Sequence, residues 1–159
     1  TELADELVGG VLSAGPTRLT AAVQANVPQV VSVGALDMVN FGSADTVPAK
    51  FAQRRFHQHN ATVTLMRTTP EENAALGAEL GRKLAPAGVR AAILLPGRGV
   101  SALDAAGQPF DDPQARRRLF DAVRLHCGDV LAESLDQPPP DRSSRRKLAS
   151  ARLGVGGSR

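Results

Sequence analysis

The apolar run at residues 89–95, VRAAILL, most narrowly limits what this chain can fold into. A continuous apolar run of this kind is expected of a strand buried in a parallel sheet. Two shorter runs, residues 29–33 and 63–66, have the same character. In chain order, segments with helical periodicity precede the first run and follow the second and third runs, so the sequence predicts a parallel sheet with right-handed crossover connections.

The predicted helices cover residues 2–13, 17–24, 70–83 and 113–126, and residues 129–135 are a candidate fourth strand. The helix from Pro70 has the clearest start, because Thr69 and Glu72 are spaced to form a reciprocal capping box. We therefore predict an α/β fold, a three-layer Rossmann-like parallel sheet with helices on both faces.

Length and composition favour one domain with an aliphatic core. The chain has 159 residues, 42% of them hydrophobic, and its aromatic residues are five Phe without Trp or Tyr. Leu, Val, Ala and Ile must therefore form most of the core. Aromatic stacking platforms for single-stranded nucleic acid are not expected in such a chain.

The positive charge is concentrated at the C-terminal end. Residues 141–159 contain six Lys or Arg and one acid, a balance of +5, which leaves −2 for the first 140 residues. Residues 137–159 are rich in Pro, Ser, Gly and Arg and poor in apolar side chains. We predict an α/β domain at residues 1–136 and a disordered, solvated tail at 137–159, without a specific nucleic-acid partner.

Cysteine usage and hydropathy bear on the compartment. Cys127 is the single cysteine, which excludes an internal disulfide framework and fits a reducing cytoplasm. No run of about 18 apolar residues is present, so no membrane association is expected.

Polar segments follow the three predicted strands at residues 34–40, 67–72 and 97–104. Ligands of open parallel sheets collect beyond the carboxyl ends of the strands, so these segments are expected to share a cleft. The whole stretch 34–60 shows little periodicity and is predicted to be a long loop, either functional or disordered.

Arg67, Thr68 and Thr69 stand at the start of the predicted helix 70–83. Helix amides and an arginine favour an anion such as phosphate or carboxylate, so these residues are candidates for an anion site. The alternative is a well-capped helix whose Arg67 pairs with Glu71 or Glu72.

The other candidates have plain alternatives as well. Asp37 and Asn40 can bind a hydroxyl or a metal, or simply shape a turn. His57 and His59 have a spacing compatible with a metal, but two His without a third ligand are more often ordinary loop residues. His59 and Asn60 remain candidates for ligand contact.

The segment GRGVSA, residues 97–102, matches a glycine-rich dinucleotide fingerprint in its spacing. No helix is predicted to follow it, which leaves at most a loose phosphate loop around Gly99. Ser101 and Asp104 lie in this loop, yet no Gly-x-Ser-x-Gly elbow is present, so a hydrolase triad is disfavoured.

Four segments, taken in order, resemble one family: TELADELVGG, VVSVGALDMVNFG, HNATVTLMRTTPEEN and GVSALDAAGQPFDDP. The family is that of the Tm-1-like ATP-binding (UPF0261) proteins of bacteria, fungi and plants. The resemblance runs from Thr1 to about Leu125. It gives added weight to the family's recurring motif positions, which here are Gly34, Asp37, Asn40, His59, Asn60, Arg67, Thr68, Thr69, Gly99, Ser101 and Asp104.

The resemblance implies that this chain is the second, α/β half of a two-domain protein about twice as long or longer. The N-terminal, nucleotide-binding half is then an expected partner, and ATP with magnesium is expected to bind mainly through it. Relatives are expected to form homodimers. Past Asp136 the relatives continue with a strand and a helix, whereas this chain has its Pro- and Arg-rich tail, for which a shifted reading frame is one explanation.

Three function hypotheses remain open. In the first, the chain is a small-molecule or nucleotide-binding module: Arg67, Thr68 and Thr69 hold an anion, Asp37, Asn40 and Asn60 orient it, and the 97–104 loop closes over it. In the second, it is an enzyme for a small carboxylated or acyl substrate, with His59 as general base and Asp104 or Asp37 orienting it. In the third, it is a protein-interaction module.

Overall fold

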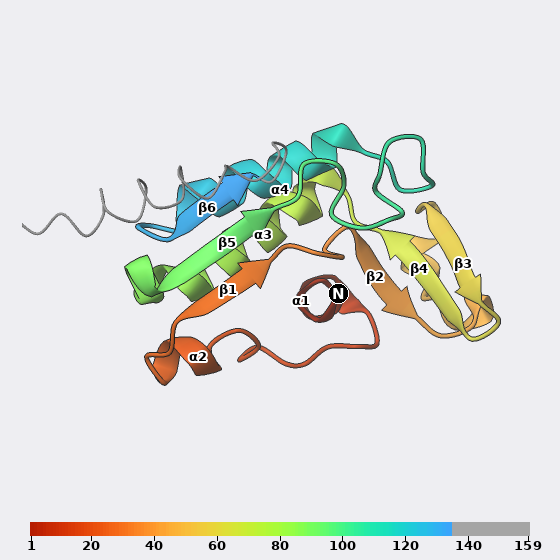
Figure 1. Cartoon of the computed structure of the whole chain (residues 1–159). Helices are drawn as coiled ribbons and strands as arrows, with labels where there is room; N and C mark the ends of the chain where they lie inside the picture. Colours follow the sequence, from red (N-terminus) through yellow and green to blue (C-terminus); the bar gives the residue numbers. More distant parts are fainter. Residues whose placement is uncertain (135–159) are drawn as a thin grey trace, which may run out of the picture.

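Two three-stranded sheets form the framework of the computed structural model, which describes residues 1–134. One sheet is parallel, with the order β1-β5-β6, and the other is antiparallel, with the order β2-β4-β3. Figure 1 shows the two sheets at opposite ends of the molecule. The mixed α/β class is therefore confirmed, while the predicted tail at 137–159 lies outside the described residues.

The strands are β1 (Gln29–Ser32), β2 (Met38–Phe41), β3 (Phe56–Asn60), β4 (Val63–Arg67), β5 (Ala91–Leu95) and β6 (Leu131–Ser134). The helices are α1 (Glu2–Ala4), α2 (Ala21–Gln24), α3 (Pro70–Leu84) and α4 (Pro113–His126). Short helical turns are η1 (Asp5–Gly9), η2 (Ala44–Thr46), η3 (Ala49–Phe51) and η4 (Ala85–Arg90). No helix among residues 1–134 has the length and apolarity needed to cross a membrane.

The parallel sheet rests on α3 and α4, which lie behind it in Figure 1. On this inner face, Ala91, Ile93 and Leu95 of β5 are buried in the same core as Leu76 of α3 and Leu119 of α4. The strands predicted at 29–33, 89–95 and 129–135 are all present in this sheet.

The two long helices begin and pack as the sequence predicts. Thr69 and Glu72 form the expected capping box of α3, and the Asp112 carboxylate accepts from the Ala115 amide at 2.9 Å to cap α4. Gly77 lets the helices approach closely, because a Cβ there would lie 2.4 Å from the carbonyl oxygen of Leu119.

The prediction for residues 34–66 is wrong in two respects. The strand at 63–66 pairs antiparallel with β2 and β3 rather than joining the parallel sheet, and the predicted loop 34–60 contains both partners. The error has a physical cause, because β4 is covered on both sides. Met66 faces the main core, and Leu65 packs against Phe110, so β4 reads as a buried run.

The predicted N-terminal helices are shorter than expected. The first ends at Gly9, because the chain turns there so that Val11 can donate to the Asn40 carbonyl at 2.9 Å. The second is reduced to Ala21–Gln24, since Leu19 has a positive φ of 77° that is incompatible with a helix.

Helices do not cover both faces of the parallel sheet within residues 1–134. Strand register places Val30, Ala92 and Leu131 side by side on the outer face, which no described helix covers (Figure 1). Val30 is 68% exposed. All-parallel sheets are almost always covered on both sides, whereas residues 1–134 cover one face of this sheet.

Candidate functional site

Arg67 is the centre of a buried polar cluster between the two sheets. It ends β4, and its side chain is only 4% exposed. Its Nε donates to the Phe110 carbonyl at 2.9 Å, and its Nη1 donates to the Asp37 carbonyl and the Thr68 hydroxyl, both at 3.1 Å. Protein acceptors therefore surround the guanidinium, and the predicted partners Glu71 and Glu72 are not among them.

Asp104 is the carboxylate partner of this arginine. Its Oδ1 accepts from Arg67 at 2.9 Å, and its Oδ2 accepts from Arg116 of α4 and from the Val100 amide at 2.9 and 3.0 Å. Burial raises the pKa of Asp104, which the Val100 amide and the two arginines oppose. Burial likewise lowers the pKa of Arg67. This ion cluster fastens the 96–112 loop to β4 and α4.

Asp37 and Ser101 form a second buried pair beside it. The Ser101 hydroxyl donates to Asp37 Oδ2 at 2.6 Å, and it accepts from the Leu103 amide at 3.1 Å. Asp37 is fully buried, and its Oδ1 has no hydrogen-bond partner among residues 1–134. Burial therefore raises the pKa of Asp37, although the Ser101 hydrogen bond and the nearby Arg67 counteract it.

Thr68, Gly34 and Gly99 complete the contact region between β4 and the loops that follow β1 and β5. The Thr68 hydroxyl donates to the Leu36 carbonyl at 3.0 Å and accepts from Asn73 Nδ2 at 2.8 Å. Gly99 has φ of 130° and no room for a Cβ, which would lie 2.9 Å from the Ala105 nitrogen. Gly34 lies nearby, where a Cβ would approach the Val100 carbonyl at 3.8 Å. Gly34, Asp37, Arg67, Thr68, Gly99, Ser101 and Asp104 are thus brought together.

Asn40 belongs to a different cluster. Its backbone amide and its side-chain amide donate to the two carboxylate oxygens of Asp5, at 2.8 and 3.0 Å. Asp5 is 1% exposed, and Val11 donates to the Asn40 carbonyl at 2.9 Å. The N-terminal segment thereby satisfies the open edge of β2, and Asn40 has a structural role.

His59 and Asn60 are also separated from the cluster. They end β3, and Asn60 Oδ1 accepts from the Thr62 amide at 2.9 Å to shape the β3–β4 turn. The opposite end of β3 lies next to Arg67, whose amide donates to the Arg55 carbonyl at 2.9 Å. Four residues of strand, roughly 13 Å, separate that end from His59. The predicted pair of His59 and Asp104 is therefore not brought together.

A surface groove of about 230 Å³ lies at the start of α3, next to the buried cluster. It is lined by Gln53, Arg54, Arg55, Arg67, Thr68, Thr69, Pro70 and Asp112. The capping box occupies the amides of Thr69 and Glu72, at 2.8 and 3.2 Å. Because Pro70 has no amide hydrogen, Glu71 is the first-turn amide that the cap does not use.

The three arginines of the groove differ in how their charge is balanced. Arg54 pairs with Glu72, its Nη1 lying 2.9 Å from Oε1, and Arg67 pairs with Asp104. Arg55 is exposed, and within residues 1–134 its side chain donates only to backbone carbonyls, those of Pro109 at 3.5 Å and Asp111 at 3.3 Å. Arg55 is therefore the groove cation without a carboxylate partner among the described residues.

Sequence reasoning missed several residues of these clusters, namely Asp5, Arg55, Asn73, Phe110 and Arg116. Arg116 carried a signal, because it lies four residues after the helix cap Asp112 and so shares its helix face. Asp5 carried none, since its partner Asn40 is 35 residues away in a segment predicted to be loop.

The fold and the clusters together define a mixed α/β module whose loops are joined by buried ionic contacts. Comparison with known proteins agrees, because a profile described as the C-terminal domain of the uncharacterised protein family UPF0261 matches residues 1–135. The chain belongs to the UPF0261 family, as its sequence motifs predict.

The relatives it matches are much longer. It is 52% identical over 124 residues to a UPF0261 protein of Clostridium tetani, covering 78% of this chain and 31% of that one. It is 50% identical over 125 residues to the ToMV resistance protein Tm-1 of Solanum lycopersicum, covering 79% and 17%. A UPF0261 protein of Rhizobium meliloti is 50% identical over 123 residues, which cover 77% of this chain and 31% of the relative.

Proposed function

We propose that this chain is an anion-binding α/β module that contacts a phosphate group, such as that of a nucleotide, in the groove at the start of α3. The observation that carries the proposal is Arg55, an exposed guanidinium that has no carboxylate partner within residues 1–134, in a groove that two further arginines line. Arginine forks match phosphate oxygens in two hydrogen bonds at once.

The roles predicted from sequence change within this proposal. Arg67 acts indirectly, because its hydrogen bonds hold the backbone carbonyls of Asp37 and Phe110 and the hydroxyl of Thr68, a residue that lines the groove. Thr69 keeps α3 capped. The amide of Glu71, which the cap does not use, can donate to an anion, and the positive end of the α3 dipole also favours an anion at this helix terminus. Glu71 and Asp112 oppose the anion electrostatically, so the proposed affinity is modest.

ATP fits the groove only in part. Pockets that enclose a drug-sized ligand measure about 300–1,000 Å³, whereas this groove measures about 230 Å³. It is large enough for the phosphate end and offers no aromatic surface for the base. No group of three potential metal ligands occurs among residues 1–134, and Asp112 is the single carboxylate among the residues that line the groove. Magnesium would therefore be held there mainly by the nucleotide phosphates and water. We propose that the remaining nucleotide contacts come from a separate N-terminal half.

Calorimetric titration with inorganic phosphate and pyrophosphate tests the proposal. Saturable binding that falls at least tenfold in Arg55→Gln is expected. Arg117→Gln, which changes an exposed arginine of α4, is the matched control and should bind as the parent does. Equal binding by both variants, or no binding by the parent chain, would contradict the groove as an anion site.

A second candidate function, protein interaction, is favoured by the outer face of the parallel sheet. A hollow of about 330 Å³ is lined there by Val30, Val89, Ala92 and Leu131, with Arg90 and Asp129 beside them. Val89 is 89% exposed. Arg90 and Asp129 form no ion pair within the described residues, and opposite charges beside an apolar patch suit a second copy of the same chain. We propose this face for the expected homodimer.

The enzyme hypothesis gains no geometric support, because His59 and Asp104 lie apart. A cytoplasmic location also stays a prediction, consistent with the free thiol of Cys127.

A further inference from the structure

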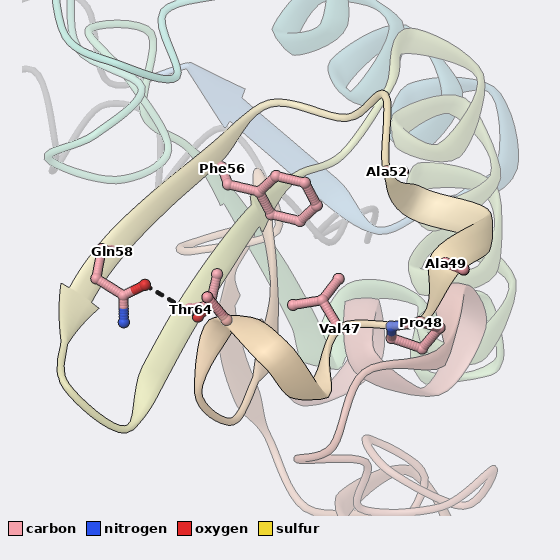
Figure 2. A pocket seen from close by; sticks show the side chains of 8 residues that line it. Val47, Pro48, Ala49, Ala52, Phe56, Gln58 and Thr64 are labelled. Carbon is pink, nitrogen blue, oxygen red and sulfur yellow. Dashed lines mark hydrogen bonds between the residues drawn. The ribbon is translucent and has the colours of Figure 1, made fainter.

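An apolar pocket lies on the antiparallel sheet, and it shares no lining residue with the anion groove. It measures about 490 Å³ and is lined by Ala44, Val47, Pro48, Ala49, Ala52, Phe56, Gln58 and Thr64. Figure 2 shows Phe56, Gln58 and Thr64 on the hairpin side and Val47, Pro48 and Ala49 on the facing turns. We propose that this pocket binds a small, uncharged, apolar molecule.

The residues that line the pocket favour an uncharged ligand. None of the eight residues is ionisable at neutral pH. The polar side chains are those of Gln58 and Thr64, and they bond to each other, the Thr64 hydroxyl donating to Gln58 Oε1 at 3.3 Å (Figure 2). The Gln58 amide nitrogen also donates to the carbonyls of Asn60 and Val63. A charged ligand would therefore lose its hydration without gaining a partner.

The pocket is preformed, because its outer wall is anchored at both ends. Phe51 is 7% exposed, and its ring lies 5.5 Å from that of Phe41 in the core. Val47 packs against the same core, and Arg54 donates to the Arg67 carbonyl at 2.7 Å. The turns η2 and η3 are thus held above the hairpin and do not collapse onto it. Preorganised pockets of this size range bind drug-sized ligands without an ordering cost.

The segment 53–55 separates this pocket from the anion groove. Ala52 and Phe56 line the pocket, whereas Gln53, Arg54 and Arg55 line the groove. The two sites can therefore be tested independently, and failure of one leaves the other standing.

The probe is N-phenyl-1-naphthylamine, a neutral apolar dye whose fluorescence rises on leaving water. We expect saturable binding at one site per chain. Ala52→Phe should fill the pocket and Pro48→Asp should place a charge in its wall, so each should weaken binding at least tenfold. Both positions are exposed, and circular dichroism will check that the fold is kept. Ala102→Phe, at an exposed alanine of another loop, is the matched control and should not change binding.

Two further arms locate and characterise the site. Val30→Asp alters the outer sheet face, and Arg55→Gln alters the groove, so both should leave dye binding unchanged. The sulfonated analogue 1-anilinonaphthalene-8-sulfonate should bind at least tenfold more weakly. The proposal is overturned if the parent chain shows no saturable binding, if Ala52→Phe and Pro48→Asp bind as the parent does, if Val30→Asp abolishes binding, or if the sulfonate binds more tightly.

Discussion

The guanidinium of Arg67 donates from Nη2 to Oδ1 of Asp104 at 2.9 Å, across 37 residues of sequence. Both side chains are buried, with exposed fractions of 4% and 0%. The contact joins the last residue of β4 to the loop that follows β5, and hence joins the two sheets. Arg67 also lines the groove that we propose as the anion site.

Arg67→Met should destabilise the protein by about 3–5 kcal/mol, because it leaves the buried Asp104 carboxylate with one of its two arginines. Urea denaturation measures the loss. Arg82→Met is the control, since Arg82 is 58% exposed and pairs with Glu79 on the surface. Equal stabilities of the two variants would show that the Arg67 cluster does not hold the fold together.

Asp37→Asn should change the pH dependence of stability. Burial raises the pKa of Asp37 in the folded protein, so its contribution is most favourable below its unfolded pKa of about 3.9 and is lost as pH rises through the folded value. The variant lacks this loss, and Asn can still accept the Ser101 hydrogen bond. The free energy of unfolding of the variant, relative to the parent, should therefore rise with pH above about 4. A constant difference across this range would argue against a perturbed Asp37.

Gly77→Ala should destabilise the protein by about 1–3 kcal/mol, the reverse of the usual helix preference for alanine. The reason is the 2.4 Å approach of the added Cβ to the Leu119 carbonyl oxygen, which would push α3 away from α4. Thermal unfolding measures the change. A stabilised variant would mean that the two helices pack less closely than described.

Charge reversal tests self-association through the outer sheet face. Arg90→Asp and Asp129→Arg should each weaken dimerisation at least tenfold, because like charges then face each other across the two-fold axis. A mixture of the two variants should form heterodimers, since both contacts become complementary again. Light scattering after gel filtration at high concentration reports the mass. A parent chain that stays monomeric at every concentration would contradict this interface.

The parallel sheet and its helices could be predicted because their signals are local. The run at 89–95, the capping box of Thr69 and Glu72, and the Asp112-Pro113 helix start all act within a few residues. The strand pairing of β4 could not be predicted in this way. Its apolar run fits either sheet, and the choice depends on Phe110, which packs against Leu65 from a distant loop.

The candidate site also has a part that could be predicted from the sequence and a part that could not. The sequence predicts that Asp37, Arg67, Ser101 and Asp104 meet, and they do, because strand ends and the loop after β5 converge there. The same prediction groups Asn40 and His59 with them, because it assumes a single sheet. In the structure, β2 and β3 belong to a separate antiparallel sheet with β4. Asn40 therefore faces Asp5, and His59 lies next to the hairpin turn.

The most direct test of the anion site is the amide spectrum of isotopically labelled protein during titration with inorganic phosphate. We predict saturable shifts that are largest at Gln53, Arg54, Arg55, Thr69 and Glu71, and that disappear in Arg55→Gln. Shifts centred elsewhere, or no saturable shifts in a chain that is folded by the same spectrum, would contradict an anion site at the start of α3.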